Sequence, residues 1–390
     1  MAWRVRQGHL DGGRPRTCGD PRPPAPFQHL TRAPDRREDG DGPAGAAGAQ
    51  AEGARATAAG SPPGRDVRFA AASNLITGTL EMPPGDAPAR AAVLFLHGSG
   101  PQDRNENSPA LALHVFDTLA ADLASAGIAS LRYDKRGVGE SPGDLLRASV
   151  HDLAADGRAA MRFLRRIHET AGLPVFLVGH DEGALLALLL AADEPPPAGI
   201  VLLCPHITPM EDVLRLQASV LQGAIERLPA EERQRLGIPE GFDQRAVTEQ
   251  MIRAIRTAPP DQPALAMGQQ TVPLRWFRSH FDLDINAVLA AVRAPALAVG
   301  AAKDAQVPPQ DAVALAARLR DASGGAAADA TAVVVADLTH VLRRTAGSGL
   351  AGEYAQLCQG PVDPEVRRLV AEWIAARIPD ETDAAGGPPA

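Results

Sequence analysis

The sequence predicts a doubly wound α/β fold, in which helices cover both faces of a mostly parallel sheet. Short continuous apolar runs recur along the chain, as in residues 91–96 (AAVLFL) and 199–203 (GIVLL). Such runs are typical of strands buried on both faces of a parallel sheet. Stretches with apolar residues at helical spacing, such as 110–126 and 149–171, separate them. This alternation of strand and helix indicates crossover connections and therefore an α/β sheet.

The ordered chain is expected to begin with an antiparallel hairpin at one edge of the sheet. The segments VRF and LITGTLEMP predict its two strands, with Ser73 and Asn74 as the turn. Further strands are predicted at residues 91–96, 128–133, 175–178, 199–203, 296–300 and 332–336. Helices are predicted at residues 110–126, 149–171, 184–190, 309–320 and 363–378.

Residues 208–286 interrupt this alternation. They are charged, helical in pattern and broken by prolines, which predicts a helical cap inserted between two parts of the core, 65–207 and 287–379. Residues 1–64 are rich in Gly, Ala, Pro and Arg without sustained periodicity, so we expect them to be disordered or to precede the true start of the protein. A disordered tail is expected at 380–390.

Composition points to a cytoplasmic protein with a small-molecule substrate. The formal charge of −8 comes without a long block of one sign, which favours neither a nucleic-acid nor a membrane partner. Three scattered cysteines (Cys18, Cys204 and Cys358) suit neither a disulfide framework nor a zinc site. The N-terminus has no apolar signal region, and no stretch of eighteen uninterrupted apolar residues follows. No feature indicates an oligomeric state.

Residues 174–190 (PVFLVGHDEGALLALLL) are the most informative stretch. An apolar strand, a turn between Gly179 and Gly183 and a run of strong helix formers follow one another. This is the pattern of a nucleophile elbow, in which small residues two before and two after the nucleophile let strand and helix approach closely. The central residue here is Asp181.

Two further residues complete the chain order nucleophile, acid, histidine. Asp304 follows the strand predicted to end at Gly300, and His340 follows the strand predicted to end at Ala336. We expect Asp304 to hold the imidazole of His340 in one tautomer, and His340 to act as general base. The sequence therefore predicts a triad of Asp181, Asp304 and His340.

The turn after strand 91–96 (HGSGPQDR) lies where such a fold places half of its oxyanion hole. The backbone N–H groups of Ser99 and Glu182 are the predicted donors. We expect His97, Gly98, Cys204, His206 and Trp276 to line the substrate pocket. No metal ligand set is predicted.

Several of these motifs together carry a family resemblance. HGSGPQDRNEN, RYDKRGVGES, GHDEGAL, GAAKDAQVP and LTH resemble the bacterial α/β-hydrolases grouped with esterases and serine-peptidase-like acyl hydrolases, over residues 66–378. The resemblance implies an α/β-hydrolase fold and hydrolysis of a carboxylic ester without a metal or organic cofactor. Members typically have GHSEG where this chain has GHDEG, so the departure falls on the nucleophile.

The chemistry of a carboxylate makes that departure important. In a tetrahedral intermediate, the carboxylate (pKa about 3.9) leaves far more easily than an alkoxide resembling hydroxide (about 15.7). The difference of roughly 12 units is on the order of 16 kcal/mol, so acyl transfer through Asp181 is disfavoured. Displacement at a saturated carbon has no such defect, since the alkyl ester that it forms on Asp181 can be hydrolysed by water that His340 activates. Haloalkane dehalogenases and epoxide hydrolases resemble this scheme.

Three functions therefore stay open, and the resemblance ranks the carboxylic ester class first. The alkyl route ranks next, because the chain lacks groups that would support it. Glu182 would repel a departing halide, and the predicted cap has no tyrosine of the kind that epoxide hydrolases use, since Tyr133 and Tyr354 lie outside it. In the third, Asp181 acts as a general base, or the pocket binds a ligand without chemistry.

Overall fold

The computed structural model of the 390-residue chain describes residues 64–379, apart from residues 73, 194, 268–269 and 323–328. Its centre is an eight-stranded sheet in the order β1-β2-β4-β3-β5-β6-β9-β10. The six strands from β4 to β10 in that order run parallel, whereas β2 pairs antiparallel with both β1 and β4. The strands are β1(Arg65–Ala71), β2(Asn74–Glu81), β3(Ala91–Leu96), β4(Ile128–Tyr133), β5(Val175–His180), β6(Gly199–Leu203), β9(Ala296–Ala301) and β10(Ala330–Val335).

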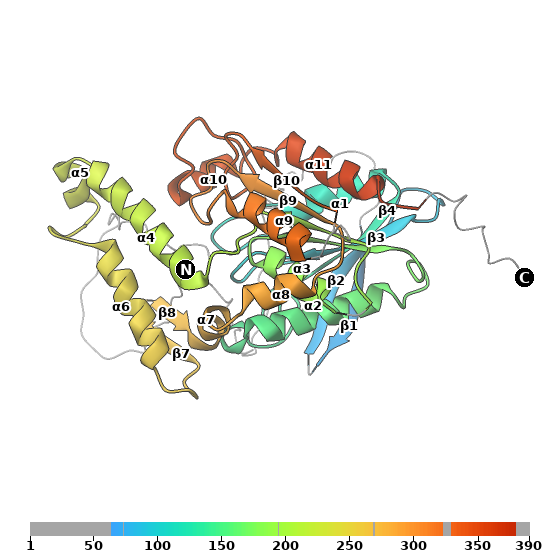
Figure 1. The fold of residues 1–390 in the computed structure, drawn as a ribbon, viewed down its shortest axis with the longest axis horizontal. Coiled ribbons are helices and arrows are strands. Elements are labelled where there is room, and N and C mark those ends of the chain that lie inside the picture. The colour runs from blue at the N-terminus through green and yellow to red at the C-terminus, as the bar shows by residue number, and fades with distance from the viewer. Residues whose placement is uncertain (1–63, 73, 194, 268–269, 323–328, 380–390) are drawn as a thin grey trace, which may run out of the picture.

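Helices cover both faces of this sheet (Figure 1). One face packs against α2, α3 and α9, with α8 lying on α3 and α9, and the other face packs against α1 and α11. The helices of these layers are α1(Val115–Ser125), α2(Val150–Leu164), α3(Glu182–Ala191), α8(Ile285–Ala291), α9(Asp311–Ala322) and α11(Pro364–Ala375), with the short α10(Tyr354–Leu357) before the last. The prediction of a doubly wound α/β fold is confirmed.

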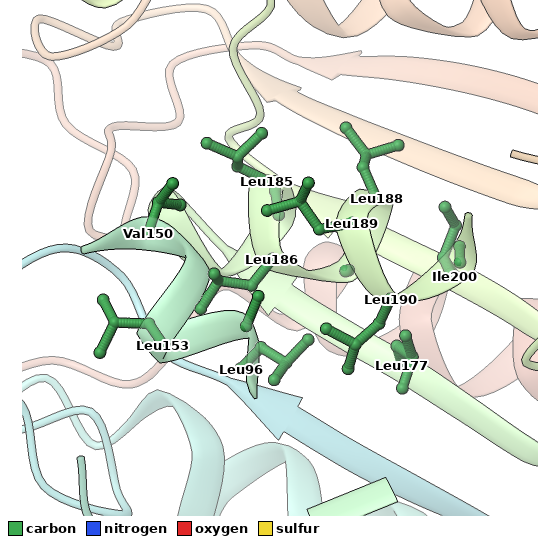
Figure 2. Close-up of a cluster of buried hydrophobic side chains, with 14 of the residues drawn as sticks. Leu96, Val150, Leu153, Leu177, Leu185, Leu186, Leu188, Leu189, Leu190 and Ile200 are labelled. Carbon is green, nitrogen blue, oxygen red and sulfur yellow. The ribbon is translucent and has the colours of Figure 1, made fainter. Parts of the chain in front are cut away.

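Helix α3 is buried along its whole length because it lies between the sheet and other helices. All of its residues are buried, including Leu185, Leu186 and Leu188. Figure 2 shows these leucines gathered between Val150 and Leu153 of α2 and the strand residues Leu96, Leu177 and Ile200. Burying a leucine stabilises the fold by about 1.5–3 kcal/mol, so this cluster fixes the start of α3 relative to the sheet.

The predicted edge hairpin is confirmed, since β1 and β2 pair antiparallel at one end of the sheet. The helix predicted over residues 149–171 ends earlier, at Leu164. The physical reason is a hydrogen bond from a side chain at the end of the helix: the hydroxyl of buried Thr170 donates to the carbonyl of Leu164 at 2.5 Å. Gly172 then takes a positive φ of 80° that turns the chain toward β5.

The segment between β6 and β9 contains more than the helices that the sequence predicts. It holds α4(Met210–Arg227), α5(Ala230–Arg235), α6(Gln244–Thr257), a two-stranded hairpin of β7(Ala264–Met267) and β8(Gln270–Pro273), and α7(Leu274–Phe281). Helices α4, α5 and α6 project beyond the sheet layers in Figure 1. Helix α7 lies against the core instead, where the N–H of Val150 in α2 donates to Ser279.

The predicted N-terminal extension, apart from Gly64, and the predicted tail at 380–390 lie outside the described residues. Among the residues that are described, no helix combines the length and the apolar character needed to cross a bilayer.

Candidate active site

The parallel strands bring the predicted site residues to one edge of the sheet. Loops at the carboxyl ends of β3, β5, β9 and β10 carry Ser99, Asp181, Asp304 and His340 respectively. Because the carboxyl ends of parallel strands meet on the same side, residues far apart in sequence come together there. The structure joins all three residues of the predicted triad.

The turn at Asp181 has the strained geometry of a nucleophile elbow. Asp181 lies at φ 52° and ψ −117°, a conformation that costs a non-glycine residue about 1–3 kcal/mol. The two glycines permit it. A Cβ at Gly179 would lie 2.1 Å from the carbonyl oxygen of Gly183, and a Cβ at Gly183 would lie 1.8 Å from that of Leu96. Both positions therefore leave no room for a side chain.

The carboxylate of Asp181 is held asymmetrically. Its Oδ2 accepts two hydrogen bonds from Ser99, from the backbone N–H at 2.8 Å and from the hydroxyl at 2.7 Å. Its Oδ1 lies 3.9 Å from Nε2 of His340. The predicted oxyanion donor Ser99 thus serves an oxygen of Asp181 itself. The other predicted donor, the N–H of Glu182, belongs to the first turn of α3, where N–H groups have no intrahelical acceptor.

His340 and Asp304 form the acid and histidine pair that the sequence predicts. Nδ1 of His340 lies 2.8 Å from Oδ2 of Asp304, whose side chain is only 1% exposed. The other oxygen of Asp304 accepts the backbone N–H groups of Gln306 and Val307. Because a carboxylate is an acceptor, Nδ1 carries a proton, and Nε2 is the nitrogen that lies toward Asp181.

The charges of the site keep Asp181 ionised and His340 protonated. Burial by itself would raise the pKa of Asp181, but His340, His180 and the N–H of Ser99 outweigh it and hold that pKa well below its usual value. Burial by itself would lower the pKa of His340, but Asp304, and then Asp181, raise it to about 9. At neutral pH the resting site therefore holds an anionic Asp181 beside a cationic His340.

A pocket with about 940 Å³ of empty space, part of it open to solvent, adjoins Asp181. Of the residues predicted to line it, Gly98, His206 and Trp276 do so. The remaining wall is mostly apolar, with a few polar side chains among its members: Leu111, Leu113, Met210, Val213, Leu214, Phe277, Val307, Val341, Gln102, Gln217, Gln306 and Tyr354.

Two predicted pocket residues do not line it. His97 is fully buried and packs edge-on against Tyr133, with ring centroids 4.8 Å apart, and burial lowers its pKa to about 3. Cys204 is buried too, with its sulfur 3.8 Å from the carbonyl oxygen of His340. Both residues directly follow a buried strand, and their side chains pack into the protein rather than into the cleft.

Three residues that sequence reasoning did not assign take part in the site. Glu106 is fully buried and accepts the N–H of Gly98 at 3.0 Å and Nδ1 of His180 at 2.9 Å. Lys135 is buried beside Glu182, and Tyr354 of α10 lines the pocket. Glu106 lies in the HGSGPQDRNEN motif and Lys135 in RYDKRGVGES, so these motifs were the available signal for two of them.

Comparisons with known proteins show the family to which the chain belongs. Residues 87–342 match the family described as Serine aminopeptidase, S33. Esterase EstD of Thermotoga maritima is 26% identical over 302 residues, which cover 77% of this chain and 66% of EstD. A monoglyceride lipase homologue of Monkeypox virus is 30% identical over 139 residues, covering 35% of this chain and 46% of that protein. The chain thus spans less than two thirds of the length of these relatives.

Solved structures show the same fold. Est1E from Butyrivibrio proteoclasticus, with ferulic acid bound, has a TM-score of 0.51 at 15% identity, over 80% of this chain and 99% of that one. The match to the S33 family covers well over half of the 390 residues and includes the elbow, Asp304 and His340. The chain therefore belongs to the serine aminopeptidase S33 family and has the α/β-hydrolase fold.

Proposed function

We propose that this protein is a cofactor-independent hydrolase in which Asp181 attacks a saturated carbon and forms an alkyl ester that water then hydrolyses. The observation that carries the proposal is the asymmetric binding of the Asp181 carboxylate. Ser99 holds Oδ2 with two hydrogen bonds, while Oδ1 lies 3.9 Å from Nε2 of His340, and Asp181 and His340 both line the pocket. One oxygen is thus fixed and the other is available as a nucleophile.

The first step needs an ionised Asp181, which the charges of the site supply. Oδ1 forms a bond to the substrate carbon, and the bond to the leaving group breaks with its electron pair going to that group. His206 and Tyr354 line the pocket, and Nδ1 of His206 donates to the carbonyl of Thr208 at 3.1 Å, so His206 can donate from Nε2 to the leaving group when its ring is protonated. The inserted segment contains no tyrosine, as the sequence shows, but Tyr354 lines the pocket from α10.

The second step depends on a change in the pKa of His340. Esterification removes the negative charge of Asp181, which is one cause of the raised pKa of His340, so the imidazole can lose its proton. Neutral His340 then takes a proton from water, and the hydroxide adds to the carbonyl carbon of the ester. The oxyanion forms on Oδ2, where Ser99 already donates two hydrogen bonds. Collapse releases the alcohol, protonated by His340, and restores the carboxylate.

The same geometry counts against acyl transfer. In a serine esterase the oxyanion donors bind the carbonyl oxygen of the substrate, but here Ser99 gives both its donors to Asp181. The protonated His340 of the resting site has no lone pair at Nε2 with which to activate water against an ester. Carboxylic ester hydrolysis remains the second candidate, because the curated relative EstD is named an esterase.

The experiment compares wild type, Asp181→Ala and Asp181→Ser on 1-bromohexane, 1,2-epoxyhexane and p-nitrophenyl butyrate. Bromide or diol release that is lost in Asp181→Ala supports the alkyl route, and in a single turnover in H₂¹⁸O the label should enter the Asp181 carboxylate. Ester turnover alone in the wild type, lost in Asp181→Ala, supports the second candidate. Ester turnover only by Asp181→Ser would mean that the scaffold is intact but the natural protein does not use acyl chemistry.

A further inference from the structure

A buried cluster of charged and aromatic side chains lies between the elbow and helix α7. Its centre is the carboxylate of Glu182, which pairs with Lys135 at 2.9 Å, and both side chains are only 2% exposed. The indole N–H of Trp276 donates to the other oxygen of Glu182 at 2.5 Å, and Nε2 of His280 lies 3.3 Å from that oxygen. Helix α7 is thus anchored on the residue that follows Asp181.

Lys135 also contacts the loop that holds the Asp181 carboxylate. Its Nζ donates to the carbonyl oxygen of Gly98 at 2.5 Å, and the next residue is Ser99. Gly98 lies close enough to Asp181 that a Cβ there would be 3.3 Å from Oδ2. One ammonium group therefore connects the loop after β3 to the start of α3, the two segments whose relative position brings Ser99 to Asp181.

Lys135 comes from a third segment, the loop after β4, so both of its contacts join segments that lie far apart in the sequence. A buried ion pair is weak evidence for stability, since burying two charges offsets most of their attraction. Lys135 does not line the pocket, whereas Glu182 and Trp276 do. Any effect of Lys135 on turnover must therefore pass through Gly98 and Glu182.

We propose that the Lys135–Glu182 ion pair is a positioning device that sets the place of Ser99 on Asp181 and of Trp276 in the pocket wall. The expected loss of kcat rests on the proposed function. The expected effect on the positions of Ser99 and Trp276 does not. Lys135 is a positioning residue rather than a catalytic one, because it neither lines the pocket nor touches the reacting atoms.

The test compares Lys135→Met with its sequence neighbour, Arg136→Met. Nε of Arg136 lies 2.7 Å from Asp156, which is 2% exposed, so each variant leaves a buried carboxylate without its cation. Neither Arg136 nor Asp156 lines the pocket. Both variants should lose thermal stability. Only Lys135→Met should lower kcat, by about 100-fold with KM changed by less than about 3-fold, on whichever of 1-bromohexane, 1,2-epoxyhexane or p-nitrophenyl butyrate the wild type turns over.

A double variant separates positioning from stability. Replacing both partners, in Lys135→Met with Glu182→Met, should recover the thermal stability lost in Lys135→Met, because apolar replacement of a buried pair is often neutral or stabilising. It should not recover kcat. Recovery of kcat in the double variant, or an equal loss of kcat in Arg136→Met, would overturn the proposal.

A spectroscopic measurement keeps the test independent of turnover. The emission of Trp276, isolated by subtracting the spectrum of Trp276→Phe, should shift in Lys135→Met because its acceptor Glu182 loses its partner, and should stay unchanged in Arg136→Met. An unchanged emission in Lys135→Met overturns the positioning role. If the wild type turns over none of 1-bromohexane, 1,2-epoxyhexane and p-nitrophenyl butyrate, the proposed function fails while this measurement still decides the inference.

Discussion

The substitution Asp181→Asn tests the central electrostatic relation of the site. The amide keeps the shape of the side chain but removes its charge, as esterification would. Asp181 Oδ1 lies 3.9 Å from His340 Nε2. Loss of one negative charge at this distance weakens the stabilisation of the imidazolium by about 1 kcal/mol in a water-like medium and about 4 kcal/mol at an effective dielectric constant of about 20. At about 1.36 kcal/mol per pKa unit, the pKa of His340 should fall from about 9 to between about 6 and 8.

The assay is an NMR titration of ¹³C-labelled histidine, with His340 assigned by the signal missing from His340→Gln. The control is Asp86→Asn, which changes the net charge equally at an exposed loop position. This control should leave the titration of His340 unchanged. A pKa of His340 that stays near 9 in Asp181→Asn, or shifts equally in Asp86→Asn, would refute the idea that alkylation switches His340 into a base.

Three further predictions follow from the same contacts. Gly183→Ala should lower the free energy of unfolding by more than about 3 kcal/mol in urea titrations, because its Cβ would lie 1.8 Å from the carbonyl oxygen of Leu96. The control is Gly352→Ala, whose Cβ would meet no atom within 4 Å, and it should change this free energy by less than about 0.5 kcal/mol. Folding raises the pKa of His340 from 6.5 to about 9, so its proton stabilises the fold by about 3 kcal/mol below pH 6.5, and this contribution is lost as the pH rises to about 9. The difference in Tm between wild type and His340→Gln should therefore shrink over that range. A constant difference would contradict this prediction. His206→Gln should lower diol formation from 1,2-epoxyhexane more than iodide release from 1-iodohexane, since iodide leaves without a proton; equal losses would exclude His206 as the donor.

The sheet, and the meeting of Asp181, Asp304 and His340 at one edge of it, could be predicted because they depend on local patterns. Continuous apolar runs located the buried strands, and the residues just after them fall at the carboxyl edge of a parallel sheet whatever the strand order. Asp181, Asp304 and His340 were found in this way. The glycines of the elbow could also be predicted, because the elbow pattern needs small residues there; a Cβ at Gly179 would meet the carbonyl of Gly183, and a Cβ at Gly183 that of Leu96.

Contacts made by side chains across the fold could not be predicted. Glu106 reaches Gly98 and His180 because its own backbone turns back at φ 68°, which no periodicity reveals. Tyr354 reaches the pocket from the short helix α10 after β10, and no motif marked this helix as part of the site. The hairpin β7–β8 has strands of four residues each, too short for an alternating pattern to stand out.

The two hydrogen bonds from Ser99 to Asp181 also determine how this protein would respond to chemical probes. Fluorophosphonates and boronates report serine hydrolases because they react with a hydroxyl and place an oxygen in the oxyanion hole. Here the elbow presents a carboxylate, and Ser99 donates both its hydrogens to that carboxylate. Such reagents should leave the protein unlabelled, and a survey of hydrolases based on them would miss it. Alkyl electrophiles that trap an aspartate as a stable ester are the reagents suited to this site.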